Sequence, residues 1–256
     1  MKLLASIASL LFAVVSAAHA DTVTPPAAPG GASLEIIAEF PAGPGPFPAV
    51  VLAPGQGYHM ALPVLTETAH KLVERGVAVF RFNWAYFSKS PAAGEPSADL
   101  SVEVQNLDAV VAAARADRRV DSSRLFVGGK SLGSLVAWQV LRHDAGLRGA
   151  LLLTPICTDE QDGKTLEVGA NSYPGLLAER RPLAFIAGDL DPNCAATTLY
   201  AFAATAKGNV RVAVVGGDHS FHHPSLAAEQ RGAAAARSIG SVAQLSADFV
   251  QDSLER

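Results

Sequence analysis

The sequence predicts an α/β fold built on a mostly parallel sheet, and three observations predict it. Short apolar runs alternate with longer segments of helical periodicity along most of the chain. Several of the apolar runs are continuous stretches of Val, Leu, Ile, Ala and Phe, which is typical of strands covered on both faces. The 256 residues, 49% of them hydrophobic, suffice for one such domain. We therefore expect about seven strands with helices on both faces of the sheet.

The first twenty residues predict an export signal that is not part of the fold. Lys2 supplies a positive charge, residues 3–15 are apolar, and Ala18-His19-Ala20 has the small side chains of a signal-peptidase site. A transmembrane anchor needs about 20 apolar residues, more than this segment has. We expect cleavage after Ala20, a periplasmic or secreted protein, and no stable membrane insertion once the signal is removed.

The rest of the chain is predicted to hold a leader and one domain. Residues 22–31 contain three Pro and two Gly, so we expect a flexible leader over residues 21–32 and the domain over residues 33–256. The expected strands, in order, are residues 33–40, 48–53, 77–84, 124–128, 149–154, 183–187 and 210–215. The expected helices are residues 61–75, 97–117, 132–143, 195–207 and 225–253.

Charge and cysteine content exclude several classes of protein. The net charge of −4 and the absence of any run of Lys or Arg argue against nucleic acid or an anionic membrane as the main partner. Two cysteines without Cys-x-x-Cys spacing predict neither a zinc site nor a disulfide-dense scaffold. We expect no metal and no cofactor, and nothing in the sequence indicates the oligomeric state.

The segment around Ser131 has the pattern of a nucleophile turn. Residues 129–133 read Gly-Lys-Ser-Leu-Gly, directly after a predicted strand and before the helix expected over residues 132–143. The two glycines leave room where strand and helix approach each other, and the helix amides favour negative charge beside the serine. A chance match in a chain with 22 Gly is the alternative, which this strand–turn–helix context disfavours.

These residues resemble those of the α/β-hydrolases. The strings Gly-Gly-Lys-Ser-Leu-Gly at residues 128–133 and Arg-Phe-Asn-Trp-Ala-Tyr at residues 81–86 are similar to the small lidless branch that neighbours the dienelactone hydrolases, and the likeness covers about residues 33–223. The resemblance implies the α/β-hydrolase fold. Only residues 155–181 separate two predicted strands, which is too short for a large cap domain. Dienelactone hydrolases carry Cys as nucleophile, so Ser131 favours ordinary esterase chemistry.

His219 is the candidate general base. It follows the last predicted strand, and an imidazole can take up and return a proton near neutral pH. An alternative groups it with His222 and His223 as a metal cluster, but no acidic or Cys partner completes that set. We expect His222 and His223 to be exposed loop residues.

The resemblance also implies the acid and the oxyanion donors. The family pattern Gly-x-x-Asp-Pro selects Asp191 to orient His219, with Asp189 as the alternative. The backbone amide of Leu132 is one expected donor to a substrate oxyanion. Gln56 matches the second, in a loop where Pro54 replaces the family's His, and a plain glycine turn is the alternative. Three residues that follow Gly57 either line the substrate pocket or pack in the core: Tyr58, His59 and Met60.

The two cysteines predict one disulfide. Cys157 and Cys194 follow two predicted strands that would be parallel neighbours, whose backbones lie about 4.8 Å apart. Such a bond would brace the loop that carries Asp191. Two unrelated buried thiols are the alternative.

The sequence as a whole predicts a serine hydrolase that cleaves small-molecule carboxylic esters through an acyl-enzyme on Ser131. A thioesterase, a peptidase or an acyltransferase would use the same residues. A non-catalytic binding protein with the same fold is the alternative from another class, and a complete Ser131, Asp191 and His219 set disfavours it.

Overall fold

The computed structural model describes residues 19–23, 34–92 and 94–256, which form an eight-stranded sheet in the order β1-β2-β4-β3-β5-β6-β9-β10. Its strands are β1 (His19–Val23), β2 (Ile36–Phe40), β3 (Phe47–Ala53), β4 (Ala78–Phe82), β5 (Val120–Lys130), β6 (Ala150–Leu153), β9 (Leu183–Gly188) and β10 (Val210–Val215). The strands β1 and β2 run antiparallel to their neighbours, and all other pairs are parallel. The prediction of a mostly parallel α/β sheet is confirmed, with one strand more than the seven expected.

The additional strand is β1, at residues where the end of the signal and the start of the leader are predicted. It pairs with β2, so that Asp21 lies opposite Ala38. Arg119 donates a hydrogen bond of 2.6 Å to the Asp21 carboxylate. Over residues 21–23 the structure thus differs from the expected leader, because pairing with an open sheet edge is a tertiary effect that local composition does not show. Residues 1–18 of the expected signal and residues 24–33 lie outside the described residues.

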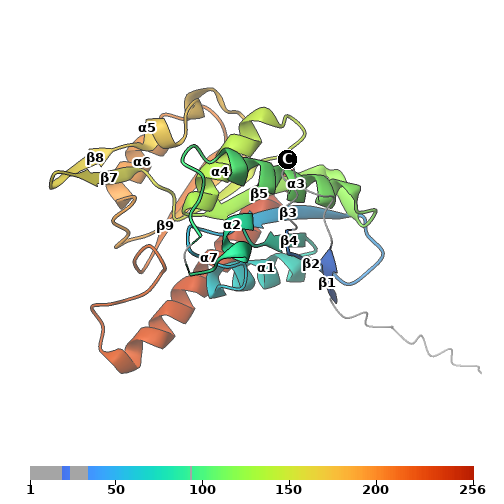
Figure 1. The fold of residues 1–256 in the computed structure, drawn as a ribbon, viewed down its shortest axis with the longest axis horizontal. Coiled ribbons are helices and arrows are strands. Elements are labelled where there is room, and N and C mark those ends of the chain that lie inside the picture. The colour runs from blue at the N-terminus through green and yellow to red at the C-terminus, as the bar shows by residue number, and fades with distance from the viewer. Residues whose placement is uncertain (1–18, 24–33, 93) are drawn as a thin grey trace, which may run out of the picture.

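Helices cover both faces of the sheet (Figure 1). They are α1 (Pro63–Glu74), α2 (Ala85–Lys89), α3 (Ser101–Ala116), α4 (Leu132–His143), α6 (Ala196–Ala203) and α7 (Ala228–Leu254). The helices α1 and α7 pack on one face, while α3, α4 and α6 pack on the other. Among the described residues, none of the helices combines the length and the apolarity needed to cross a membrane.

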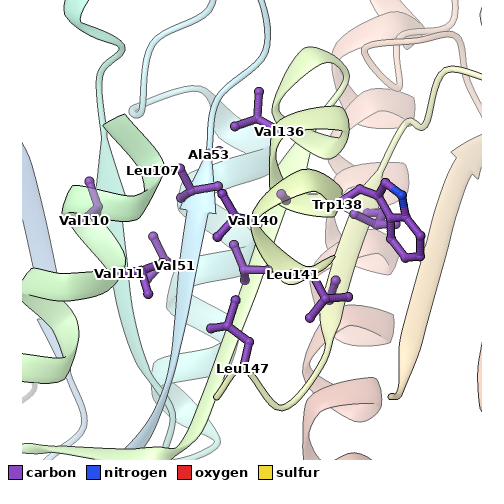
Figure 2. Close-up of a cluster of buried hydrophobic side chains, with 14 of the residues drawn as sticks. Val51, Ala53, Leu107, Val110, Val111, Val136, Trp138, Val140, Leu141 and Leu147 are labelled. Carbon is purple, nitrogen blue, oxygen red and sulfur yellow. The ribbon is translucent and has the colours of Figure 1, made fainter. Parts of the chain in front are cut away.

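The strand β3 shows why its sequence is apolar throughout. Side chains alternate along a strand, so Val51 and Ala53 join the cluster under α3 and α4, whereas Val50 and Leu52 pack toward α1 and α7. Figure 2 shows the first of these clusters, with Val51 beside side chains from both helices. The continuous apolar runs therefore correspond to strands that are buried on two faces.

The segment between β6 and β9 is small, and no large cap domain is present in the described part of the chain. It holds the hairpin strands β7 (Thr158–Gln161) and β8 (Lys164–Glu167), the short helix α5 (Gly169–Ser172) and the 3-10 helix η1 (Leu176–Ala178). We call residues 154–182 the insert. Apart from the buried Thr158, the hairpin is exposed and mostly polar, so its sequence shows no apolar alternation.

The topology fixes where a site can form. The strands β3, β5, β9 and β10 are mutually parallel, so the loops after them emerge at one edge of the sheet. Between β3 and β5 the strand order reverses, since β4 lies beyond β3 and β6 lies beyond β5. In open α/β sheets, ligands bind at such a switch point, outside the carboxyl ends of the strands.

Candidate active site

Ser131 occupies a strained turn between β5 and α4. Its backbone has φ 56° and ψ −123°, a region that residues with side chains rarely adopt. The Ser131 amide donates to the Leu153 carbonyl at 2.9 Å, and its own carbonyl accepts from the Ser134 amide at 2.8 Å and from the Ser134 hydroxyl at 2.6 Å. These bonds hold the serine at the head of α4.

Glycine is required where the turn meets β3. A Cβ on Gly133 would lie 2.5 Å from the Pro54 carbonyl oxygen and 2.7 Å from that of Ala53, closer than real Cβ contacts come. The backbone of α4 therefore packs directly against the end of β3. This is the steric reason expected for the glycine from the sequence pattern.

The structure brings Ser131, His219 and Asp191 together. The distance between His219 Nε2 and Ser131 Oγ is 2.8 Å, and His219 Nδ1 lies 2.9 Å from both carboxylate oxygens of Asp191. The Asp191 side chain is fully buried, and the His219 side chain is mostly buried. An alcohol, an imidazole and a carboxylate in this order can transfer the proton of the alcohol to the imidazole and stabilise the resulting cation.

The alternative acid, Asp189, has a different partner. Its Oδ1 accepts a hydrogen bond of 2.7 Å from the Gly217 amide. Asp189 therefore connects the loop after β9 to the turn after β10, and Asp191 is the carboxylate that contacts His219.

The loop that carries Asp191 is fastened to the insert. A disulfide joins Cys157 to Cys194. The amides of Cys157 and Thr158 both donate to the Asn193 carbonyl at 2.8 Å, and the Thr158 hydroxyl donates to the Pro192 carbonyl at 2.6 Å. The loop that carries the Asp191 carboxylate is thus held by the insert through one covalent bond and three hydrogen bonds.

The candidate oxyanion donors lie next to the nucleophile. Leu132 is the first residue of α4, where helix amides have no partner within the helix. Gln56 belongs to the turn after β3, and a Cβ on its neighbour Gly55 would lie 3.3 Å from Ser131 Cβ. The Gln56 side chain is tied to Glu95 by a hydrogen bond of 2.8 Å, which fixes this turn from outside.

The three residues after this turn lie in different surroundings. The Tyr58 hydroxyl is 2.7 Å from Ser220 Oγ, so Tyr58 reaches the turn of His219. His59 is exposed, and its Nδ1 accepts from the Ala61 amide. Met60 is only 5% exposed, and its carbonyl accepts a hydrogen bond from the buried Arg81. Of the two alternatives for Met60, lining the pocket or packing in the core, its surroundings match packing in the core.

Two buried polar side chains beside the site are absent from the sequence prediction. Lys130 directly precedes Ser131 and is 1% exposed, with Nζ 4.3 Å from the centre of the Tyr58 ring. Burial lowers the pKa of Lys130 to about 8, against the opposing effect of the Asp191 and Asp218 carboxylates. A lysine at the end of an apolar, doubly covered strand was the available signal.

The second is Tyr173, which lies in the insert and is 1% exposed. Its hydroxyl is 2.8 Å from Ser134 Oγ and accepts from the Ile156 amide at 3.0 Å. Because Ser134 also contacts the Ser131 carbonyl, Tyr173 links the insert to the nucleophile turn. No motif marks this role in the sequence.

In the part of the chain that the structure describes, no group of three or more His, Cys, Asp or Glu side chains is arranged to hold a metal ion. His222 is exposed as expected, whereas His223 is only partly exposed, with its Nε2 2.9 Å from Ser238 Oγ. Neither histidine contacts His219 through a side chain among these residues.

Comparison with known proteins agrees with this architecture. A model of the alpha/beta hydrolase domain family matches residues 47–251. The structure of a dienelactone hydrolase from Anabaena variabilis is similar, with TM-score 0.69 and 14% identity, covering 92% of this chain and 98% of that chain. No curated protein sequence matches the chain.

Two further solved structures share the fold. An a/b serine hydrolase without lid from Xanthomonas campestris has TM-score 0.62 and 19% identity, covering 95% of this chain and 97% of that chain. The esterase domain of a Rhodothermus marinus protein has TM-score 0.66 and 15% identity, covering 91% of this chain and 99% of that chain. At these identities the likeness concerns the fold.

Proposed function

The chain belongs to the alpha/beta hydrolase domain family, and on that premise we propose that it is a serine hydrolase of small carboxylic esters that acts through an acyl-enzyme on Ser131. The observation that supports this most is the unbroken contact from Ser131 Oγ to His219 Nε2 at 2.8 Å and from His219 Nδ1 to Asp191 at 2.9 Å. Two of the structural neighbours, a dienelactone hydrolase and an esterase domain, carry names of the same reaction class.

In the proposed mechanism, Ser131 Oγ attacks the ester carbonyl carbon while its proton passes to His219 Nε2. The carbonyl oxygen becomes an oxyanion, which accepts hydrogen bonds from the amides of Leu132 and Gln56. Asp191 remains ionised and stabilises the imidazolium. When the tetrahedral intermediate collapses, His219 gives its proton to the leaving alcohol and the acyl group stays on Ser131.

Water completes the cycle by the same steps. His219 takes a proton from a water molecule, whose oxygen attacks the acyl carbon. The second oxyanion uses the same two amides, and its collapse returns the proton to Ser131 and releases the carboxylic acid. The insert is too small to form a large cap domain over the site. Such an open site suits small or extended esters better than buried long-chain lipids.

The test is the substitution Ser131→Ala with a short p-nitrophenyl ester and a fluorophosphonate probe. We expect wild-type protein to be labelled and active, and the variant to be unlabelled, with kcat reduced at least about 10⁴-fold. Ser241→Ala, which changes an exposed serine on α7, is the matched control and should behave as wild type. Ester turnover that survives Ser131→Ala contradicts the proposal.

Two other results would favour a different function for the protein. Labelling of Ser131 without ester turnover would favour a thioester, a peptide or transfer to another acceptor. A wild-type protein that the probe does not label would favour a non-catalytic binding protein.

We further propose that the protein acts in the periplasm or outside the cell. The predicted signal with cleavage after Ala20 supports this, and so does the Cys157–Cys194 bond, since disulfides persist in oxidising compartments. Terminal sequencing of the exported protein should begin at Asp21. Retention of the whole chain in the cytoplasm contradicts this location.

A further inference from the structure

Lys130 is a buried cation that the proposed mechanism does not use. Its Nζ has no hydrogen-bond partner among the residues that the structure describes, although the residue is 1% exposed. A buried ammonium is costly unless it is paired, so most buried lysines have a carboxylate or several acceptors. The pKa of Lys130, about 8, still leaves the group mostly charged at neutral pH.

This side chain lines a cavity of about 110 Å³. A volume of this size is about that of three or four water molecules at roughly 30 Å³ each, which is also enough for a carboxylate with a short alkyl stem. Besides Lys130, the wall combines apolar residues such as Val64 and Ile239 with the hydroxyls of Tyr58 and Ser220 and with His222. A polar head bound at Lys130 and an apolar stem would both find complementary contacts there.

Positive charge at the cavity comes from Lys130 and from the amino end of α1, while burial lowers the Lys130 pKa and the Asp191 and Asp218 carboxylates lie near enough to oppose that shift. Residues 62–64 are the amino end of α1, where the helix dipole presents partial positive charge. The nearby carboxylates have other partners: Asp218 accepts from the Ser220 and His222 amides at 2.8 and 2.9 Å, and Asp191 contacts His219. Within the described residues, neither of them forms an ion pair with Lys130.

The cavity also borders three of the loops that carry proposed catalytic groups, those of Ser131, Gln56 and His219. Lys130 precedes Ser131, Tyr58 follows the turn of Gln56, and Ser220 follows His219. The hydrogen bond between Tyr58 and Ser220 closes the wall of the cavity where the last two loops meet. A group bound at Lys130 would therefore contact direct chain neighbours of Ser131 and His219.

We propose that the cavity at Lys130 is a subsite for a small carboxylate group, which pairs with the Lys130 ammonium while its stem contacts Val64 and Ile239. The carboxylate is either a free anion or the second acid group of a half-ester substrate. The second case rests on the proposed function, and the first does not.

Binding of a free carboxylate is tested on the Ser131→Ala protein, so the result does not depend on turnover. Sodium acetate is titrated by calorimetry at constant ionic strength maintained with sodium chloride. We expect saturable binding that weakens on the order of tenfold or more in Ser131→Ala/Lys130→Met, because a charge-assisted hydrogen bond is lost. Lys164→Met, at an exposed lysine of β8, is the matched control and should leave binding unchanged.

A second variant keeps the test independent of how Lys130→Met folds. Ile239→Phe adds bulk to the cavity wall without altering the charge, and it should weaken acetate binding as well. If acetate binds to the Ser131→Ala protein equally well with and without Lys130→Met or Ile239→Phe, the cavity is not a subsite for a free carboxylate.

Hydrolysis distinguishes the two sources of the carboxylate. The ratio of kcat/KM for monomethyl glutarate over methyl valerate is measured in wild type and in Lys130→Met. If the carboxylate belongs to the substrate, the ratio should be about ten or more in wild type and fall toward one in the variant. Acetate binding without such a preference assigns the subsite to a free anion. If acetate does not bind and the wild type shows no preference for the half-ester, the proposal is overturned. Hydrolysis of both esters at equal rates would still leave the proposed function intact.

Discussion

The nucleophile turn and the acid loop carry two members of one candidate triad, yet they are held in different ways. The turn of Ser131 is fixed by backbones in direct contact, with Gly133 against the carbonyls that end β3. The loop of Asp191 is fixed by a disulfide and by hydrogen bonds from the insert. An added methyl group at Gly133 would disturb the turn of Ser131, whereas the loop of Asp191 depends on a crosslink and on polar contacts.

Their places in the sheet explain the contrast. The turn of Ser131 follows β5, which lies in the centre of the sheet between β3 and β6. The loop of Asp191 follows β9, next to the edge strand β10, and the polar insert covers it. A loop near an edge has fewer apolar neighbours, so other interactions must supply its rigidity.

Gly133→Ala should have the largest effect, because it affects both folding and activity. The new methyl would overlap the Pro54 carbonyl, and relieving the overlap must move Ser131 away from His219. We expect unfolding free energy to fall by about 1–3 kcal/mol or more and ester hydrolysis to fall about 10²-fold. Urea unfolding and fluorophosphonate labelling measure the two effects.

Gly232→Ala is the matched control for this change. A Cβ on Gly232 meets no atom within 4 Å, and the residue is exposed in α7. The control should be neutral or stabilising by up to about 1 kcal/mol, since alanine favours helix. Equal behaviour of the two alanine variants would show that the turn tolerates a methyl group.

Removing the disulfide should affect stability more than chemistry. In Cys157→Ser/Cys194→Ser, the loss of the crosslink over residues 157–194 should lower the unfolding free energy by about 2–4 kcal/mol. The folded protein keeps the Thr158–Pro192 hydrogen bond, so its kcat/KM should stay within a few-fold of wild type. A large loss of kcat/KM at unchanged stability would mean that the disulfide positions Asp191 by itself.

Tyr173→Phe tests the link between the two regions. The change removes the hydroxyl between Ser134 and Ile156 and should cost about 1–3 kcal/mol, because buried polar groups lose a partner. Tyr200→Phe, at a tyrosine that is 52% exposed, is the control and should be nearly neutral. If both variants unfold at the same urea concentration, the link contributes nothing to stability.

The smallest effect concerns acid pH and the insert. The hydrogen bond from Arg181 lowers the pKa of Glu179 to about 2, while burial opposes the shift. A lowered pKa stabilises the folded state above the ordinary value of 4.5, and this contribution disappears as the pH falls toward about 2. Glu179→Gln should therefore be less stable than wild type at pH 7, by less than about 1 kcal/mol because the pair is partly exposed, and equal to it near pH 2.

Thermal unfolding of wild type and Glu179→Gln across this pH range measures the difference. Glu255→Gln, at an exposed residue after α7, is the control and should show no such dependence. A stability difference that persists at pH 2 would assign the effect to something other than the charge.

The sequence predicted best where the signal is local. The strand–turn–helix around Ser131 and the continuous apolar run of β3 depend on neighbouring residues, and both are as expected. The prediction did not include β1 or the β7–β8 hairpin, because these strands are defined by pairing and carry no apolar pattern. The burial of Lys130 likewise depends on how β5 is covered by other segments, which no window of the sequence contains.

The parallel order of the central strands also bears on how the protein folds. Ser131 and His219 are 88 positions apart in the chain, and β3 pairs with β5 across some 70 residues. Closing such loops costs chain entropy before any contact repays it, so folds of this topology form slowly. The proposed triad is complete only when β9 and β10 have joined β6. Recovery of activity during refolding would therefore report the last stage of sheet assembly, later than the recovery of helical circular dichroism.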